Sequence, residues 1–398
     1  MNRPVITPEP DDLQELVRHL HQQGEPWLPS GLGSRLDWGP AVAAHAEVLS
    51  TARLDRVLEL NPGDFTITVQ AGTPFHRVQS ALAEHRQWLA LDWPWGSGPG
   101  GEGSGSIGGL VARGLAGGYR QRYLGVRDQL IGIGLMRSDG TAARAGGKVV
   151  KNVAGYDLMR LLCGSWGSLA LITEVTLRTL PIPPQRRGLW LSGALEPLVA
   201  LSRWLLNSGF SPERLEWLRL ADAEPGLLVS LASISSQTLD EQVAGISTQA
   251  ETLGCRCALL TPEQRQQRLA EGQGSGLKAH WLLRIGVPSP SCRELLEEPA
   301  LAGIPIALGA GSGLAMAWAD EVHLPAFRVE ALRRRCLSLG GFLTVLRQPP
   351  GACIPAWLDA PSRPVIEAVK RRFDPKQQLA RGRLPGVTPA RSYSASTR

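Results

Sequence analysis

PSGLGSR, residues 29–35, and SIGG, residues 106–109, are the two stretches of this 398-residue chain that decide its expected fold. Each follows an apolar run, and the second lies within a glycine- and serine-rich segment, residues 96–118. Glycine has no Cβ, so backbone N–H groups can turn toward an anion and approach it closely. Two such loops in one domain predict a ligand with a pyrophosphate that is held from two sides.

The length and composition predict a globular protein of two or three domains, because 398 residues exceed one ordinary core. Hydrophobic residues make up 43% and charged residues 20%, and no stretch has the length and apolarity of a membrane span. The first residues lack the apolar core of a signal peptide, so we expect a cytoplasmic location. The net charge of +6 comes without a dense basic run interleaved with aromatics, which argues against a nucleic-acid partner.

Metal binding is not predicted. The 6 cysteines form no C-x-x-C pair, and the 7 histidines are scattered along the chain. In a cytoplasmic protein such cysteines are expected to be reduced thiols.

Hydrophobic periodicity predicts alternating helices and strands before residue 185. A helix is expected to begin near the start signal at residues 7–9 and to run to Gly24, followed by a short strand through Trp27 and Leu28 that leads into the first loop. Further strands are expected over 54–60, 65–70, 130–135, 142–145 and 168–180, and further helices over 74–85 and 153–162.

A cluster of prolines near residues 181–184, followed by Arg186 and Arg187, predicts a domain boundary. Beyond it, strands over 227–231, 281–287 and 314–318, with helices over 238–253 and 326–339, predict helices packed on an antiparallel or mixed sheet. A last helix is expected over 362–373. The predicted units are residues 1–185, 186–345, a C-terminal segment 346–385, and a disordered tail 386–398.

The glycine-rich segment 96–118 has competing interpretations. Its composition also fits a flexible linker, but the apolar residues Ile107, Leu110, Val111 and Leu115 would serve no purpose there. A formal G-x-G-x-x-G occurs at 103–108, yet the preceding residues make a poor strand, which disfavours a Rossmann unit. The chain has no G-x-x-x-x-G-K-[ST] motif, so nucleotide triphosphate hydrolysis lacks support.

The order of these motifs resembles the FAD-binding domain of the vanillyl-alcohol oxidase/p-cresol methylhydroxylase superfamily. The matching residues are Gly31, Gly33 and Ser34, then 106–118, and then Tyr123, Gly125, Arg127 and Asp128. Residues 151–158, KNVAGYDL, and 164–175, GSWGSLALITEV, resemble one branch, the FAD-binding subunit of bacterial-type glycolate oxidase. The resemblance covers residues 5–185 well and residues 373–383 moderately.

The resemblance implies an α+β fold: a p-cresol methylhydroxylase-type FAD-binding domain of two α/β subdomains, a smaller α+β cap and a C-terminal return segment. It implies FAD as the cofactor and no metal, and it singles out no catalytic residue. Together with the glycine loops it gives these expected cofactor-binding residues: Ser30, Gly31, Leu32, Gly33, Ser34, Arg35, Gly96, Ser106, Ile107, Gly108, Gly109, Ala112, Gly117, Gly164, Ser168, Ala170, Ile172 and Val175.

The function implied is that of a subunit supporting oxidation of glycolate, a small 2-hydroxy acid, to glyoxylate. In that family a sister flavin subunit is thought to hold the substrate-oxidising site, and an iron–sulfur subunit takes the electrons onward. The partners expected by resemblance are these two subunits, through which the chain would contact the inner membrane. A stand-alone 2-hydroxy-acid or sugar-acid oxidase, a nicotinamide-dependent dehydrogenase and a scaffold with a vacated flavin site are the alternatives.

Two departures from the family pattern bear on these alternatives. Ala380 stands where relatives commonly have Asn, so one polar contact to the flavin region is expected to be missing. The expected cap has only His280 and His323 and no H-x-H pattern for metal binding or proton abstraction. A carboxylate substrate calls for a positioned arginine, for which Arg219 and Arg284 are candidates, although packing roles fit both.

Overall fold

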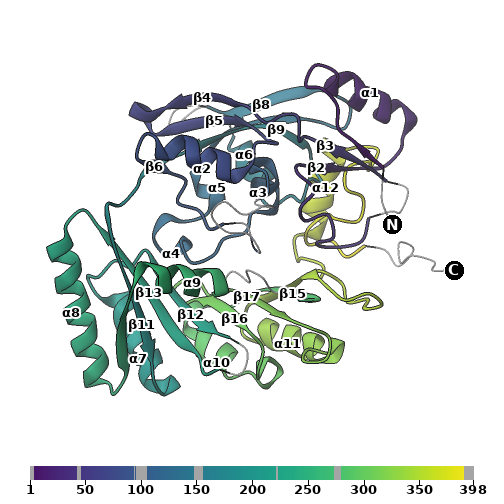
Figure 1. The fold of residues 1–398 in the computed structure, drawn as a ribbon. Helices are drawn as coiled ribbons and strands as arrows, with labels where there is room; N and C mark the ends of the chain where they lie inside the picture. Colours follow the sequence, from purple (N-terminus) through teal and green to yellow (C-terminus); the bar gives the residue numbers. More distant parts are fainter. Residues whose placement is uncertain are drawn as a thin grey trace.

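The computed structural model describes residues 4–42, 46–93, 95, 105–147, 156–220, 223–272 and 279–389. Figure 1 shows an upper domain built from the first part of the chain and a lower one built from the middle part. The last part of the chain, coloured yellow, runs from the lower domain back to the upper one (Figure 1).

The first subdomain is a small parallel sheet with strand order β1-β3-β2. Its elements are β1 (Val5–Ile6), α1 (Leu13–Gln23), β2 (Trp27–Ser30) and β3 (Glu47–Ser50). Leu13, Val17 and Leu20 recur on one face of α1 and are buried in the same cluster as Trp27. Gly24 ends the helix with a φ of 77°, a conformation that glycine adopts without strain.

The second subdomain is a five-stranded antiparallel sheet, ordered β4-β5-β9-β7-β8. Its strands are β4 (Val57–Asn61), β5 (Thr66–Gln70), β7 (Leu130–Met136), β8 (Ala142–Gly146) and β9 (Leu171–Arg178). The helices packed on it are α2 (Phe75–Ala83), α3 (Ile107–Arg113), α5 (Val126–Gln129) and α6 (Leu158–Leu162). A short turn η1 (Pro62–Asp64), a helix α4 (Arg120–Tyr123) and the pair β6 (Gln87–Trp88) and β10 (Leu180–Pro181) complete the domain.

The cap is an eight-stranded antiparallel sheet, ordered β14-β11-β13-β12-β16-β17-β15-β18. Its strands are β11 (Gln185–Ser192), β12 (Arg214–Arg219), β13 (Gly226–Ser233), β14 (Arg256–Leu260), β15 (Trp281–Gly286), β16 (Ile306–Gly309), β17 (Leu314–Ala319) and β18 (Phe342–Arg347). Its helices are α7 (Leu195–Asn207), α8 (Ser236–Thr252), α9 (Pro262–Gly272), α10 (Cys292–Leu296) and α11 (Ala326–Ser338), with short turns η2 (Ser289–Ser291) and η3 (Pro299–Leu301).

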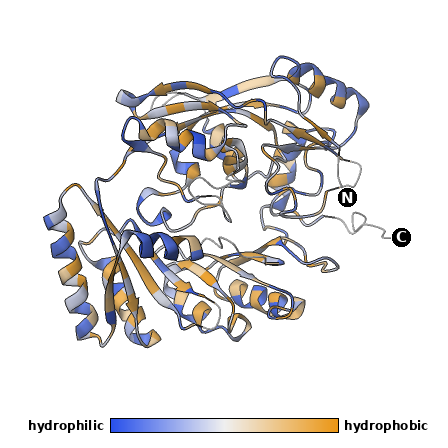
Figure 2. Ribbon diagram, in the orientation of Figure 1, coloured by the Kyte–Doolittle hydropathy of each residue, from blue (hydrophilic) through white to orange (hydrophobic). Residues whose placement is uncertain are grey.

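The two faces of the cap sheet have different partners. Leu215 and Trp217 of β12 belong to a core shared with α7, α8 and α11, whereas Leu218 belongs to a second cluster that includes residues of the upper domain. Figure 1 shows α9 alone on the side of the sheet that faces the upper domain, and Figure 2 shows hydrophobic and hydrophilic stripes along the outer helix α8. The inner face therefore forms a wall opposite the glycine loops.

The C-terminal return segment docks on both subdomains of the upper domain. Val369 and Phe373 of α12 (Arg363–Phe373) pack against the core of the second subdomain, and the residues after α12 pair with the first. Trp27 donates its backbone N–H to the Gln378 carbonyl at 3.0 Å, and Ala380 donates to the Trp27 carbonyl at 2.9 Å. The predicted fold class is thus confirmed: two subdomains, an α+β cap and a returning C-terminal segment.

Some predicted element boundaries are wrong. The strand expected over 168–180 is β9, Leu171–Arg178, because Ser168 belongs to a turn in which its N–H bonds the Ser165 carbonyl at 3.0 Å. The residues just before Ser168 bond to α3. Gly164 donates to the Val111 carbonyl at 3.0 Å and Trp166 to the Ala112 carbonyl at 2.9 Å. The helix expected over 153–162 begins at Leu158 in the described part of the chain. Residues 390–398 of the expected tail lie outside the described residues.

Candidate functional site

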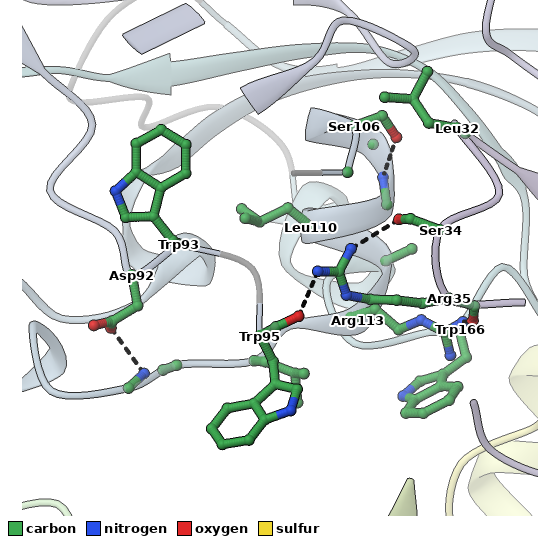
Figure 3. A pocket seen from close by; sticks show the side chains of 18 of the residues that line it. Leu32, Ser34, Arg35, Asp92, Trp93, Trp95, Ser106, Leu110, Arg113 and Trp166 are labelled. Carbon is green, nitrogen blue, oxygen red and sulfur yellow. Dashed lines mark hydrogen bonds between the residues drawn. The ribbon is translucent and has the colours of Figure 1, made fainter. Parts of the chain in front are cut away.

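A deep cavity lies between the two domains. Its upper walls are the first glycine loop, the helix α3 and the segment 115–118, and its lower wall is formed by α9 and strands β12, β16 and β17 of the cap. Figure 3 shows this cavity with Ser34, Arg35 and Trp166 on one side and Asp92 and Trp93 on the other.

At the start of the first loop, two carbonyl groups accept hydrogen bonds from the end of β3 and the residue after it. The Ser30 carbonyl accepts from the Thr51 N–H at 2.8 Å, and the Gly31 carbonyl accepts from Ser50 Oγ at 2.8 Å. Among the described residues no acceptor bonds the N–H groups of residues 31–34. This loop therefore offers a row of backbone donors at the cavity surface, which suits an anion.

Backbone N–H groups of the second loop are already bonded to acceptors within the protein. Ser106 caps α3 by accepting from the Gly109 N–H at 3.1 Å. The Ile107 N–H bonds the Thr73 carbonyl at 3.0 Å, and the Gly108 N–H bonds the Ala71 carbonyl at 2.8 Å. The hypothesis that both loops donate backbone hydrogen bonds to a ligand is therefore supported for the first loop and not for these three N–H groups of the second.

The two loops are in direct contact. A Cβ on Gly31 would stand 2.8 Å from the Cβ of Ser106 and closer still to its hydroxyl. The sequence-based hypothesis requires the loops to face one cavity, and they do.

Most of the expected cofactor-binding residues line the cavity. Those on its wall are Ser30, Gly31, Leu32, Gly33, Ser34, Arg35, Ser106, Gly108, Gly109, Ala112, Gly117, Ala170 and Ile172. Ile107 and Val175 are buried in the core of the second subdomain. Gly164 and Ser168 are also absent from the wall. Gly96 lies outside the described residues, as does Lys151.

Gly164 and Ser168 hold the wall from behind. Gly164 packs against Gly114, where an added Cβ on Gly114 would stand 3.0 Å from the Gly164 Cα. Ser168 is fully buried, its hydroxyl donates to the Ser165 carbonyl at 2.6 Å, and its carbonyl accepts from Lys370 Nζ at 2.6 Å. Both residues therefore position α3 and the C-terminal segment.

One end of the cavity is basic. Arg35, Arg113 and Arg383 line it, and Arg113 donates from Nη2 to the Arg35 carbonyl at 2.7 Å. The Arg113 guanidinium lies 3.9 Å from the centre of the Trp166 ring. Burial, followed by the neighbouring charges of Arg383 and Arg35, lowers the pKa of Arg113 to about 9. Burial lowers the pKa of Arg35 to about 10.

The other end holds a buried ionic network between the domains. Arg214 of β12 pairs with Asp92 of the upper domain and with Glu216 of its own strand. Asp92 also accepts the Gly117 N–H at 2.9 Å. Burial lowers the pKa of Arg214, and the Glu216 carboxylate offsets part of that effect. The Arg214 guanidinium lies 4.2 Å from the centre of the Tyr119 ring, so it is enclosed on all sides.

The arginines considered from sequence as carboxylate ligands lie elsewhere. Arg219 donates to the carbonyls of Ile304, Leu296 and Leu301 at 3.1, 3.1 and 2.6 Å, which anchors the cap. Arg284 is buried near the Phe342 ring, 5.5 Å from its centre, and is absent from the cavity wall. The cavity arginines of the cap are Arg214 and Arg268.

The histidines of the cap do not form a metal site. His323 bonds Asp320 at 2.7 Å on the surface, and His280 is 3.9 Å from Glu321. Over the described ranges, no group of three potential metal ligands occurs.

Sequence reasoning missed Asp92, Arg113, Arg214, Glu216 and Arg383. The alternation RLEWLR in β12 places Arg214 and Glu216 on the face opposite Leu215 and Trp217, a pattern that predicts a strand with one polar face. Nothing in that pattern shows that the polar face is buried against a second domain.

The cavity fits FAD. Unused backbone donors and three arginines suit the diphosphate, while Trp93, Trp95 and the small residues of α3 give apolar walls for the rings. Trp93 packs edge-on against Phe75, with ring centres 5.0 Å apart, and Trp95 lies 4.7 Å from Trp318 of the cap.

Comparison with known proteins agrees with this geometry. Residues 4–146 match a family model described as FAD binding domain. The chain is 38% identical over 176 residues to D-2-hydroxyglutarate dehydrogenase of Xanthomonas citri pv. viticola, covering 44% of this chain and 36% of that protein. It is 33% identical over 196 residues to glycolate oxidase subunit GlcE of Escherichia coli, covering 48% of this chain and 53% of that protein.

The fold is also seen in a solved structure. Alkyldihydroxyacetonephosphate synthase superposes with a TM-score of 0.69 at 13% identity, covering 96% of this chain and 77% of that one. This likeness shows the fold alone.

Residues 4–146 thus define an FAD-binding domain of the p-cresol methylhydroxylase type, and FAD is its cofactor. The predicted relationship to the FAD-binding subunits of glycolate oxidase is confirmed. The chain spans about a third of the first of these curated relatives and about half of the second. No helix in the described part of the chain is both long and apolar enough to cross a bilayer.

Proposed function

We propose that this chain is an FAD-dependent oxidoreductase subunit that serves the oxidation of a 2-hydroxy acid. Among such acids we favour glycolate, which is oxidised to glyoxylate. The FAD-binding domain and the names of its relatives support the class of reaction. FAD, when bound, supplies the redox chemistry, and the protein contributes binding, orientation and electrostatics.

The chemistry of the cavity wall favours a supporting role over direct substrate oxidation. Oxidation of an alcohol requires a group that takes the hydroxyl proton. The described residues on the wall include no histidine, lysine, tyrosine or cysteine. Its two carboxylates, Asp92 and Glu216, are both held by Arg214. The pairing of both of these carboxylates with Arg214 is the observation that carries the proposal.

The same carboxylates oppose a second anion at the cap end. A 2-hydroxy acid is itself a carboxylate, and like charges in a buried site repel strongly. In the proposed arrangement the diphosphate lies at the basic end beside the first loop, and the network of Asp92, Arg214 and Glu216 holds the cap closed over the rings.

The proposed partners are a sister flavin subunit that oxidises the substrate and an iron–sulfur subunit that accepts the electrons. The support is that one relative is itself a glycolate oxidase subunit. A cytoplasmic location, and contact with the inner membrane only through partners, belong to the same proposal.

A stand-alone 2-hydroxy-acid oxidoreductase is the second candidate, because a D-2-hydroxyglutarate dehydrogenase is among the relatives. Arg268 on α9 reaches the cavity from the cap and lies 4.5 Å from the centre of the Trp190 ring, where it could receive a substrate carboxylate. This candidate requires turnover by the chain alone.

An absorbance spectrum of the purified chain distinguishes the two candidates. We expect an oxidised flavin spectrum that anaerobic glycolate, D-lactate or D-2-hydroxyglutarate leaves unchanged. Bleaching of the flavin band should appear only after the sister subunit is added. Bleaching by any of these acids without a partner would replace the proposal by the stand-alone candidate, and a colourless protein that binds no added FAD would end both.

A further inference from the structure

We propose that Arg113 is a side-chain ligand of the FAD diphosphate, with Nη2 fixed on the first glycine loop and Nη1 bonded to the anion. This inference rests on the proposed function, because it takes FAD as the occupant of the cavity. The sequence-based hypothesis had the glycine loops bind the diphosphate mainly through backbone N–H groups. In this inference the Arg113 side chain contributes part of that binding.

The contacts of Arg113 prepare it for a ligand. It is the last residue of α3 and lines the cavity. Its Nη2 bonds the Arg35 carbonyl at 2.7 Å and its guanidinium lies 3.9 Å from the centre of the Trp166 ring. Its Nη1 is buried and bonds no atom of the described chain. A buried guanidinium donor without an acceptor is costly, so such an atom points to a missing partner.

The charge around Arg113 indicates that this partner is an anion. Arg35 and Arg383 are close enough to disfavour its protonated form. The carboxylate that acts in the opposite direction is Asp37, which is largely exposed and faces Arg347 at 3.8 Å. Asp37 is thus the one carboxylate that favours the charged form of Arg113, and it is solvated. A diphosphate would supply the compensating charge, since arginine binds phosphate oxygens through paired donors.

The position of Arg113 selects the diphosphate among the parts of FAD. The first loop, with its unused N–H groups, begins at Gly31 and ends at the residue whose carbonyl anchors Arg113. Asp92 lies on the opposite side of the view in Figure 3. FAD carries its negative charge on the diphosphate in the middle of the molecule, with an uncharged ring system on either side. The arginines at the Arg113 end therefore favour a pose in which the diphosphate lies beside Arg113.

The test is FAD affinity of the full chain, stripped of flavin, measured by quenching of FAD fluorescence at several salt concentrations. The variant is Arg113→Gln, which removes the charge. The matched control is Arg284→Gln, which removes a buried arginine near an aromatic ring but outside the cavity wall. We expect Arg113→Gln to weaken FAD binding by about tenfold or more and to flatten its salt dependence. Arg284→Gln should change neither quantity.

Melting of the flavin-free protein separates a ligand role from a structural one. Because Arg113→Gln removes an uncompensated charge, the flavin-free Tm should stay near that of the parent, while the rise in Tm on adding FAD should shrink. If that variant does not fold, Arg113→Lys, which keeps the charge, should still bind FAD more tightly than Arg113→Ala. Unchanged FAD affinity and salt dependence in Arg113→Gln would overturn the inference alone. Failure of the parent chain to bind FAD would overturn the proposed function as well.

Discussion

Gly31 is the residue of the first loop that packs directly against Ser106 of the second. Any side chain there would enter the space of Ser106, whose hydroxyl is engaged in capping α3. The close approach therefore requires glycine on one loop and a small cap residue on the other. This juxtaposition could be anticipated from the two motifs, because both were expected to bind one ligand.

We predict that Gly31→Ala loses most of its FAD, because the new Cβ separates the first loop from α3. The flavin content of the purified protein, read from the ratio of absorbance at the flavin band to that at 280 nm, is the measurement. Gly63→Ala is the control, since a Cβ at Gly63 meets nothing within 4 Å. Gly31→Ala combined with Ser106→Gly should recover part of the flavin, because the obstructing side chain is then absent. Full flavin content in the single variant would contradict this account.

Other residues show where sequence reasoning stops. Gly108 was expected to bind the cofactor, but a Cβ there would also stand 2.7 Å from the Cβ of Ala71, a packing constraint that the motif does not reveal. Ala380 adopts a φ of 44°, a left-handed conformation that Asn accepts more readily than Ala, which explains why an Asn suits this position. Tyr156 is 90% exposed, a placement that the motif around it does not reveal. Packing and exposure of this kind depend on segments that are distant in the sequence, so local sequence patterns do not predict them.

At the scale of elements, α12 fastens the C-terminal segment through one buried ion pair. Lys370 Nζ donates to Asp374 Oδ2 at 2.5 Å, to the Ser168 carbonyl at 2.6 Å and to the Leu379 carbonyl at 2.9 Å. Both charged side chains are almost fully buried. Burial lowers the pKa of Lys370, and the Asp374 carboxylate offsets part of this effect.

We predict that Lys370→Met destabilises the protein by about 3–5 kcal/mol, because it leaves the Asp374 carboxylate buried without its cation. Urea unfolding, followed by tryptophan fluorescence, gives the free energy of unfolding. Lys370→Met with Asp374→Leu should cost less than Lys370→Met alone. Arg363→Met on the same helix is the control, since its pairs with Asp359 and Glu367 are exposed and should matter little. Equal losses in the control and in Lys370→Met would contradict the role of the buried pair.

The elements most easily predicted are those with strong periodicity. The buried strand β7 and the amphipathic helix α12 lie within two residues of the expected limits. Helix α1 ends where expected but begins at Leu13, several residues after the start signal at 7–9. Strand β12 and helix α9 were not predicted, because their charged residues conceal the apolar positions. These two elements supply Arg214 and Arg268 to the cavity, so the cap side of the site could not be predicted either.

At the scale of the whole molecule, Arg214 joins the cap to the FAD-binding domain. Its partners come from both sides of the cavity, and Gly117 and Gly118 pack beside them. Removing the guanidinium would leave Asp92 and Glu216 as neighbouring buried carboxylates that repel each other.

We predict that Arg214→Gln loosens the contact between the domains without unfolding either one. Hydrogen exchange of the segment 115–123 should become at least tenfold faster, whereas exchange in the buried strand β7 should stay slow. Arg187→Gln, which removes a partner of the exposed Asp240 on the cap, is the control and should have a smaller effect. Unaltered exchange in 115–123 would show that the network does not hold the domains together.

Arg383 and Leu28 line the same cavity although more than 350 positions separate them along the chain. During synthesis, the pocket therefore cannot be complete until the residues around Arg383 have left the ribosome and packed against those around Leu28. We accordingly expect flavin loading to be a late, post-translational event.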